Sequence, residues 1–148
     1  MLVILIMNLL VGCSNKKNES LNCVYTETRG VITITETTIL EHKNGKMIKI
    51  KQGTESEMEL DEIEDFVERL KHDSYIFNSI QGIDIDIEIN DDKTSYIYSL
   101  LIDFKILDYD ALEKLLETIN YDFDIKVSQD YKLSDYKEML EERGRVCN

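Results

Sequence analysis

Residues 82–104, GIDIDIEINDDKTSYIYSLLIDF, set the architecture of this chain. Apolar and polar residues alternate strictly in residues 83–89, a polar turn follows at 90–92, and every second residue from 96 to 104 is apolar or aromatic. Such alternation is typical of strands with one buried and one solvated face. The stretch therefore predicts an antiparallel β-hairpin. Its expected inner face consists of Ile83, Ile85, Ile87 and Ile89 on the first strand and Tyr96, Tyr98, Leu100, Ile102 and Phe104 on the second.

A similar hairpin is predicted nearer the N-terminus. Residues 31–40 alternate after Gly30, residues 41–45 supply an Asn-Gly turn, and residues 47–52 return with Ile48 and Ile50 toward the core. Residues 23–28 read as a strand that precedes this hairpin.

Each predicted hairpin is followed by a helix-forming pattern with one apolar stripe. Asp61 and Asp108 are the expected N-terminal caps. Residues 71–80 are less regular, and we expect Tyr75, Ile76 and Ile80 to pack loosely there. Because glycine, strand, turn, strand and helix occur in this order twice, we predict a duplicated β-β-α unit. The stripes consist of Ile63, Phe66, Val67 and Leu70, and of Leu112, Leu115, Leu116 and Ile119.

The C-terminal part completes the predicted fold. Residues 121–131 are interpreted as a loop with a short strand at 123–127. Ser134 is expected to cap a last helix that ends at Gly144, and residues 145–148 to form a short closing strand beside the first strand. Together these elements predict an α+β fold: a single domain over residues 21–148 with helices on one face of an antiparallel sheet.

Residues 1–12, MLVILIMNLLVG, form a separate segment that is apolar apart from Asn8 and carries no charged side chain. As a helix it would span roughly 18 Å, short of a hydrocarbon core of about 30 Å. A buried core helix is the alternative, but such a helix is usually amphipathic. The segment is typical of the apolar core of a secretory signal peptide.

The four residues 10–13, Leu-Val-Gly-Cys, resemble the lipobox of bacterial lipoproteins. The resemblance implies that Cys13 receives a diacylglyceryl group, which anchors the protein in the membrane, and becomes the mature N-terminus. Residues 13–20 would then be the lipidated cysteine and a polar tether. No Lys or Arg precedes the apolar run, so the signal is weak or the true start lies upstream. Plain secretion and an intracellular thiol are the alternatives.

The sequence contains three cysteines. If Cys13 carries lipid, Cys23 and Cys147 remain as one pair, which we expect to oxidise to a disulfide outside the cytoplasm. A reactive redox pair is the alternative, although no C-x-x-C motif is present.

Charge and composition restrict the partners. The net charge of −13 disfavours binding to nucleic acid, and it also disfavours binding of the folded body to anionic headgroups. Proline and tryptophan are absent, while Ile, Asp, Glu, Lys and Tyr are abundant, which suggests AT-rich codons. We therefore expect a low-GC Gram-positive bacterium, with the protein at the extracellular face of its cell membrane.

The lipobox, the stretch CVYTE at residues 23–27, the two hairpin-plus-helix passages and LSDYKEMLEERGRVC at residues 133–147 together resemble the YehR-like lipoproteins. This family of small bacterial lipoproteins is uncharacterised. The resemblance implies an α+β fold and no catalytic residues to transfer. The chain departs from the family pattern at Arg145, where an aromatic residue commonly follows the glycine.

Candidate chemical groups are few. Asp84, Asp86 and Glu88 project from one strand face, where they either form a solvated surface or bind a cation such as Ca²⁺. We favour the solvated surface, because an extended strand cannot curl around an ion. His42 and His72 are expected on the surface. No phosphate-loop or dinucleotide pattern is present, so no metal and no cofactor are expected. Tyrosines could rim a binding groove, although half-buried core positions are favoured for Tyr25, Tyr96, Tyr98, Tyr121, Tyr131 and Tyr136.

No catalytic constellation is recognisable in the sequence. The favoured hypothesis is a lipid-anchored, non-enzymatic module that binds an envelope protein or a small ligand. The alternatives are an envelope hydrolase or modifying enzyme, which a pocket with a buried carboxylate or histidine would favour, and a purely structural envelope lipoprotein.

Overall fold

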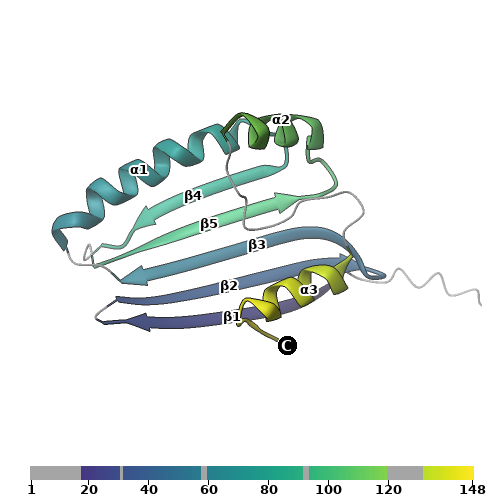
Figure 1. Cartoon of the computed structure of the whole chain (residues 1–148), viewed down its shortest axis with the longest axis horizontal. Helices are drawn as coiled ribbons and strands as arrows, with labels where there is room; N and C mark the ends of the chain where they lie inside the picture. Colours follow the sequence, from purple (N-terminus) through teal and green to yellow (C-terminus); the bar gives the residue numbers. More distant parts are fainter. Residues whose placement is uncertain (1–17, 31, 58–59, 92–93, 120–131) are drawn as a thin grey trace, which may run out of the picture.

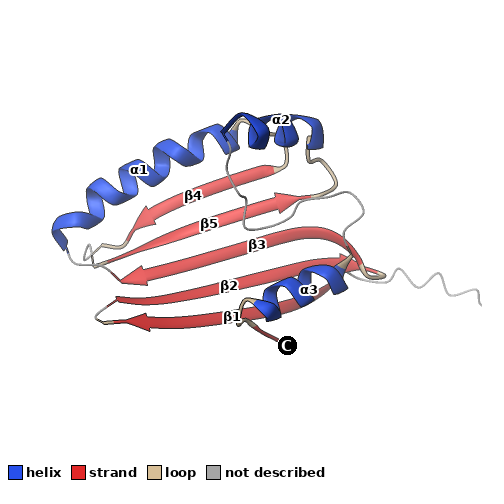
Figure 2. Ribbon diagram, viewed as in Figure 1, coloured by secondary structure: helices blue, strands red, loops and turns tan. Residues whose placement is uncertain are grey.

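The computed structural model describes residues 18–30, 32–57, 60–91, 94–119 and 132–148 (Figure 1). The described elements alternate between hairpins and helices, in agreement with the α+β fold predicted from the sequence (Figure 2). In chain order they are β1 (Glu19–Arg29), β2 (Ile32–Lys43), β3 (Lys46–Glu57), α1 (Leu60–Asn78), β4 (Ile83–Ile89), β5 (Ser95–Asp103), α2 (Tyr109–Ile119), α3 (Leu133–Glu142) and β6 (Val146–Cys147).

The strands form one open sheet in the order β4-β5-β3-β2-β1-β6, and each strand is antiparallel to its neighbours. The hairpins β2–β3 and β4–β5 lie side by side, because β3 pairs with β5 (Figure 1). The long N-terminal strand β1 adds to the β2 edge. It begins at Glu19, so it includes the last two residues of the expected tether.

The turn between β2 and β3 shows how local sequence fixes the register. Asn44 and Gly45 both have positive φ, 54° and 75°, as a two-residue type I′ turn requires. This turn is tighter than the predicted loop at 41–45. The strand β2 continues through His42 to Lys43, with a bulge between Glu41 and His42.

One face of the sheet is apolar and covered by helices. In β4, buried and exposed side chains alternate as predicted, with Ile83, Ile85 and Ile87 inside. A single core cluster joins this face to all three helices, which places the helices on one side. The helical members of the buried cluster are Ile63, Val67 and Phe77 of α1, Leu112 of α2, and Tyr136 and Leu140 of α3.

The helix α1 lies along β4 and β5, whereas α3 lies over the β1–β2 side of the sheet (Figure 1). The sequence prediction for α1 was wrong in two respects. The helix starts at Leu60, so Asp61 lies inside it, and it runs without interruption to Asn78. In consequence Tyr75 is largely exposed and Ile76 partly exposed, while Ile80 beyond the helix is buried.

Of the three predicted N-terminal caps, Asp108 is confirmed, whereas Asp61 and Ser134 are not. Asp108 caps α2, because its carboxylate accepts a hydrogen bond from the backbone N–H of Ala111 at 3.0 Å. Lys132, rather than Ser134, is the N-cap of α3. There the side chain of Asp135 reaches back to the backbone N–H of Lys132 at 3.0 Å.

Gly144 stops the helix α3, as predicted; the last helical residue is Glu142 and Arg143 is the C-cap. The backbone N–H groups of Gly144 and Arg145 donate to the carbonyls of Glu141 and Leu140, at 3.0 and 3.1 Å. This pair of bonds defines a Schellman motif, and Gly144 has the required positive φ of 83°. The motif turns the chain so that β6 returns alongside β1.

The elements of the predicted repeat occur in the predicted order, because a hairpin is followed by a helix twice, as β2-β3-α1 and as β4-β5-α2. Gly30 and Gly82, which precede the two hairpins, both have positive φ, 63° and 92°. The two helices are not placed alike, because α1 lies along the second hairpin and α2 lies near the C-terminal half of α1 (Figure 1). An internal duplication stays a prediction.

Several predicted features lie outside the described residues: the signal segment at 1–12, Cys13, and the loop at 121–131 with Tyr121 and Tyr131. Within the part of the chain that the structure describes, no helix combines the length and hydropathy needed to cross a bilayer.

Candidate functional site

A cavity of about 310 Å³ lies between the C-terminal half of α1, the inner face of β4 and β5, and the end of α2. Most of its surface is apolar. Three polar side chains, Asp73, Ser74 and Tyr98, share the lining. The apolar lining residues are Leu70, Ile76, Phe77, Ile85 and Ile119.

The cavity results from a small residue on the inner stripe of α1. Leu70, Ser74 and Phe77 follow one another at the i, i+4, i+7 spacing that faces the sheet. Ser74 is buried where a large side chain would fill the space above Ile85 and Tyr98. Its hydroxyl donates to the carbonyl of Leu70 at 2.7 Å, so this polar group is satisfied inside the helix.

The rim of the cavity is acidic. The side chain of Asp73 is 80% exposed, which places its carboxylate at the mouth rather than inside. The imidazole Nδ1 of His72 lies 3.5 Å from this carboxylate and is exposed as well. A carboxylate in this setting is solvated, so it lacks the buried environment that prepares an acid or base for catalysis.

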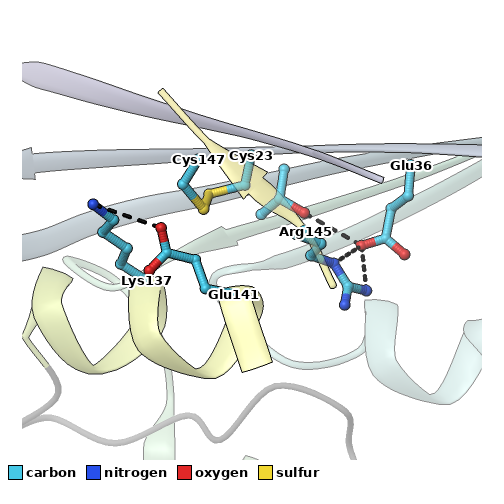
Figure 3. Close-up of a disulfide and its surroundings, with 7 residues drawn as sticks. Cys23, Glu36, Lys137, Glu141, Arg145 and Cys147 are labelled. Carbon is cyan, nitrogen blue, oxygen red and sulfur yellow. Dashed lines mark hydrogen bonds and ion pairs between the residues drawn. A yellow bond between two sulfur atoms is a disulfide. The ribbon is translucent and has the colours of Figure 1, made fainter. Parts of the chain in front are cut away.

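A second notable region lies at the edge of the sheet formed by β1 and β6, opposite the β4 edge and next to the C-terminus. Cys23 of β1 and Cys147 of β6 face each other and form a disulfide, with 4.0 Å between their Cα atoms (Figure 3). The flanking Asn22 and Asn148 exchange two backbone hydrogen bonds, 3.1 and 2.8 Å long. The cysteines therefore occupy a non-hydrogen-bonded pair, the antiparallel position at which side chains come closest.

Beside the disulfide, Arg145 forms a largely buried ion pair with Glu36 of β2 (Figure 3). Their side chains are 14% and 13% exposed, and Nε of Arg145 lies 2.6 Å from the carboxylate. The guanidinium also lies over the ring of Tyr25, 5.7 Å from its centroid. Arg145 thus connects β6 to β1 and β2.

The ion pair continues into a surface network along β1. Glu27 accepts hydrogen bonds from Arg29 at 2.7 Å and from the hydroxyl of Tyr25 at 2.9 Å. The bond from Arg29, followed by that from Tyr25, lowers the pKa of the Glu27 carboxyl below its usual value. The network fixes the position of the Tyr25 ring beneath Arg145, so we assign it a structural role.

The three acidic residues that alternate along β4 form a solvated surface. Asp84, Asp86 and Glu88 are all exposed, on the face of β4 that points away from the helices. Over the described ranges, no three His, Cys, Asp or Glu side chains are grouped so that they could hold a metal ion.

The predictions for the histidines and tyrosines had mixed outcomes. His72 is exposed, as expected. His42 is buried inside β2, so its assignment to the surface was wrong, and its Nδ1 has no hydrogen-bond partner in the described structure. Tyr136 is fully buried and packs edge-on against Phe104. Of the tyrosines named as candidates, Tyr25, Tyr96 and Tyr98 are half-buried, as favoured.

Comparison with solved structures identifies this arrangement as a known α+β fold with an open antiparallel sheet. An NMR structure of a Streptococcus pneumoniae TIGR4 protein matches with a TM-score of 0.58 and 11% identity, over 100% of this chain and 95% of that one. The NMR structure of the Escherichia coli YehR protein matches with a TM-score of 0.59 and 18% identity, over 88% and 91%. At these identities the likeness shows the fold alone, so the resemblance to YehR is confirmed at that level.

Neither a protein-family model nor a curated protein sequence matches the chain. Consequently, no residue role is carried over from a relative. The sites described above rest on the geometry of this molecule.

Sequence reasoning missed both the cavity and the Arg145–Glu36 pair. The available signal for the cavity was Ser74, a small polar residue in an otherwise apolar helical stripe. The ion pair joins residues 109 positions apart, and local patterns contain no information about such a contact.

Proposed function

We propose that this chain is a lipid-anchored binding protein of the bacterial cell envelope, attached to the outer face of the membrane through Cys13. The supporting observation is the Cys23–Cys147 disulfide. Disulfides persist mainly outside the cytoplasm, and Cys13 is the remaining one of the three cysteines in the sequence. The remaining thiol stands at the position that the lipobox pattern assigns to the lipid.

The distance from the proposed anchor to the fold is short. Since β1 begins at Glu19, six positions separate it from Cys13 (19 − 13 = 6). Even a fully extended chain of this length spans only about 20 Å. The domain would therefore stay close to the membrane surface, and two acyl chains would suffice for stable anchoring.

Binding, rather than catalysis, fits the cavity under α1. Its lining combines a mostly apolar wall with a few polar groups, the composition typical of small-molecule sites. A hydrolase would need a positioned nucleophile or a buried carboxylate, whereas the described lining offers one exposed carboxylate, that of Asp73. We therefore rank the envelope hydrolase, and a purely structural role, behind ligand binding.

The anchoring proposal is tested by metabolic labelling. Cells that express the chain are grown with radioactive palmitate, and the wild type is compared with Cys13→Ala. We expect label in the wild type alone, and release of the variant from the membrane fraction. Cys23→Ala is the matched control, because it changes a cysteine without removing the attachment site. Equal labelling of wild type and Cys13→Ala would refute the proposal.

A further inference from the structure

We infer that the cavity under α1 binds a small molecule with an apolar body and a neutral or cationic polar end. This inference rests on the proposed binding function and specifies the ligand class. It is independent of the lipid anchor, because every residue that carries it lies in the described domain.

The size of the cavity restricts the ligand. About 310 Å³ is at the lower end of the range of roughly 300–1,000 Å³ found for small-molecule sites. The walls come from α1, α2, β4 and β5, so the space is bounded on several sides by regular structure. A compact ring system or a short aliphatic segment fits such a space, whereas a folded partner does not.

The interior selects apolar groups. The hydroxyl of Ser74 is engaged by the carbonyl of Leu70, so it offers little to a ligand. Apolar side chains provide most of the wall, including Phe77 and Ile85, which belong to the buried core. Transfer of an apolar body from water into this space is favoured by the hydrophobic effect.

The mouth disfavours anions. Asp73 contributes a carboxylate at the rim, and the exposed imidazole of His72 is 3.5 Å from it. The chain as a whole carries a net charge of −13, which repels a negatively charged ligand. A neutral or cationic end group at the rim therefore complements the site, and an anionic one does not.

Two fluorescent probes with the same anilino-naphthalene core test both parts of this inference. N-phenyl-1-naphthylamine is neutral, and 8-anilino-1-naphthalenesulfonate is anionic. Both are titrated into the full chain with Cys13→Ser, which cannot be acylated. We expect saturable 1:1 binding of the neutral probe, and binding of the anionic probe that is weaker by about tenfold because of charge repulsion.

Matched substitutions locate the binding. Ser74→Leu places a large side chain in the cavity and should abolish binding of the neutral probe. Ser99→Leu introduces the same side chain on the exposed, opposite face of β5 and should leave binding unchanged. Both variants retain residues 1–12, so probe bound to that apolar segment would persist in both. Asp73→Asn should reduce the difference between the two probes.

Amide chemical shifts provide a readout that does not depend on how Ser74→Leu folds. On addition of the neutral probe, the amide signals of Ser74, Phe77, Ile85 and Tyr98 should shift more than those of Asp84 and Ser99 on the other face. Absence of saturable binding, or shifts confined to other regions, would overturn the site. Equal affinity for the two probes would overturn the charge preference. Failure of palmitate labelling would refute the lipid anchor and would leave the ligand site unaffected.

Discussion

At the scale of single residues, Arg145 connects the C-terminal segment to two strands of the sheet. It forms an ion pair with Glu36, lies over Tyr25, and belongs to the turn that places Cys147 opposite Cys23. Loss of one partner of a buried pair leaves an uncompensated charge in a poorly solvated place. Removing one partner is therefore expected to lower the free energy of unfolding by more than the intact pair contributes to it.

Arg145→Met should lower the free energy of unfolding by about 3 kcal/mol, since the carboxylate of Glu36 would stay buried without its cationic partner. Arg145→Met combined with Glu36→Leu should recover a large part of this loss. Lys137→Met is the control, because the Lys137–Glu141 pair is about half exposed and such pairs contribute less than about 1 kcal/mol. Urea denaturation measures all three. A similar decrease in the free energy of unfolding for Arg145→Met and Lys137→Met would contradict the claim that the Arg145–Glu36 pair is energetically different from an exposed pair.

Asp135 should make stability depend on pH at the start of α3. The hydrogen bond from the backbone of Lys132, followed by that from Ser134, lowers the pKa of Asp135 below its ordinary value of 3.8. A lowered pKa means that the stabilising contribution is complete above 3.8 and is lost as the pH falls through the lower, folded-state pKa. Between pH 5 and pH 2.5, Asp135→Asn should therefore show a smaller decrease in Tm than the wild type.

Asp110→Asn is the matched control for that experiment, because Asp110 is an exposed first-turn carboxylate of α2. Its acid-induced decrease in Tm should equal that of the wild type. If Asp135→Asn and the wild type lost Tm in parallel over this range, the proposed role of the Asp135 carboxylate would be wrong.

At the scale of elements, glycines determine where the hairpins begin. Gly82 has φ of +92°, and a Cβ placed on it would lie 2.6 Å from Cα of Leu107. Gly30 has φ of +63° but open space around it, and Gly53 combines open space with ordinary backbone. Strain and steric overlap can thus be separated along one series of Gly→Ala variants.

Gly82→Ala should lower the free energy of unfolding by about 3 kcal/mol or more, because backbone strain and overlap with rigid backbone add. Gly30→Ala should lower it by about 1 kcal/mol from strain alone. Gly53→Ala should be close to neutral. Thermal and urea unfolding provide the comparison. An equal effect at Gly82 and Gly30 would show that the contact with Leu107 relaxes freely.

Elements with strong local patterns were predictable from sequence. Ile83–Ile89 alternates so strictly that the buried face of β4 follows directly, and Gly144 correctly marks the end of α3. Errors arose where a polar residue interrupted a pattern. Ser74 made the second half of α1 look irregular, and the broad polar loop assigned to 41–45 concealed that β2 continues through His42.

The candidate site was less predictable than the fold, because it depends on which elements meet. The cavity needs α1, α2, β4 and β5 together, and no segment alone encodes their arrangement. The disulfide was an exception. Counting cysteines paired Cys23 with Cys147, and the antiparallel register of β1 and β6 explains why they meet.

At the scale of the whole molecule, the disulfide joins residues 124 positions apart and so closes nearly the entire domain. In the loop-entropy model such a crosslink stabilises by about 4–5 kcal/mol. We expect the double variant Cys23→Ser, Cys147→Ser to lose a comparable free energy of unfolding. Reductant should lower the urea midpoint of the wild type, and leave that of the double variant unchanged. Equal midpoints for oxidised and reduced wild type would contradict a structural crosslink.

The central claim is that Cys13 carries the lipid while Cys23 and Cys147 are bonded to each other. The most direct test is the intact mass of the protein extracted from its native membranes without reductant. We predict a chain that begins at Cys13, increased by a diacylglyceryl group and decreased by two hydrogens for the disulfide. A chain recovered from the cytosol that still begins at Met1 and carries three free thiols would contradict the account.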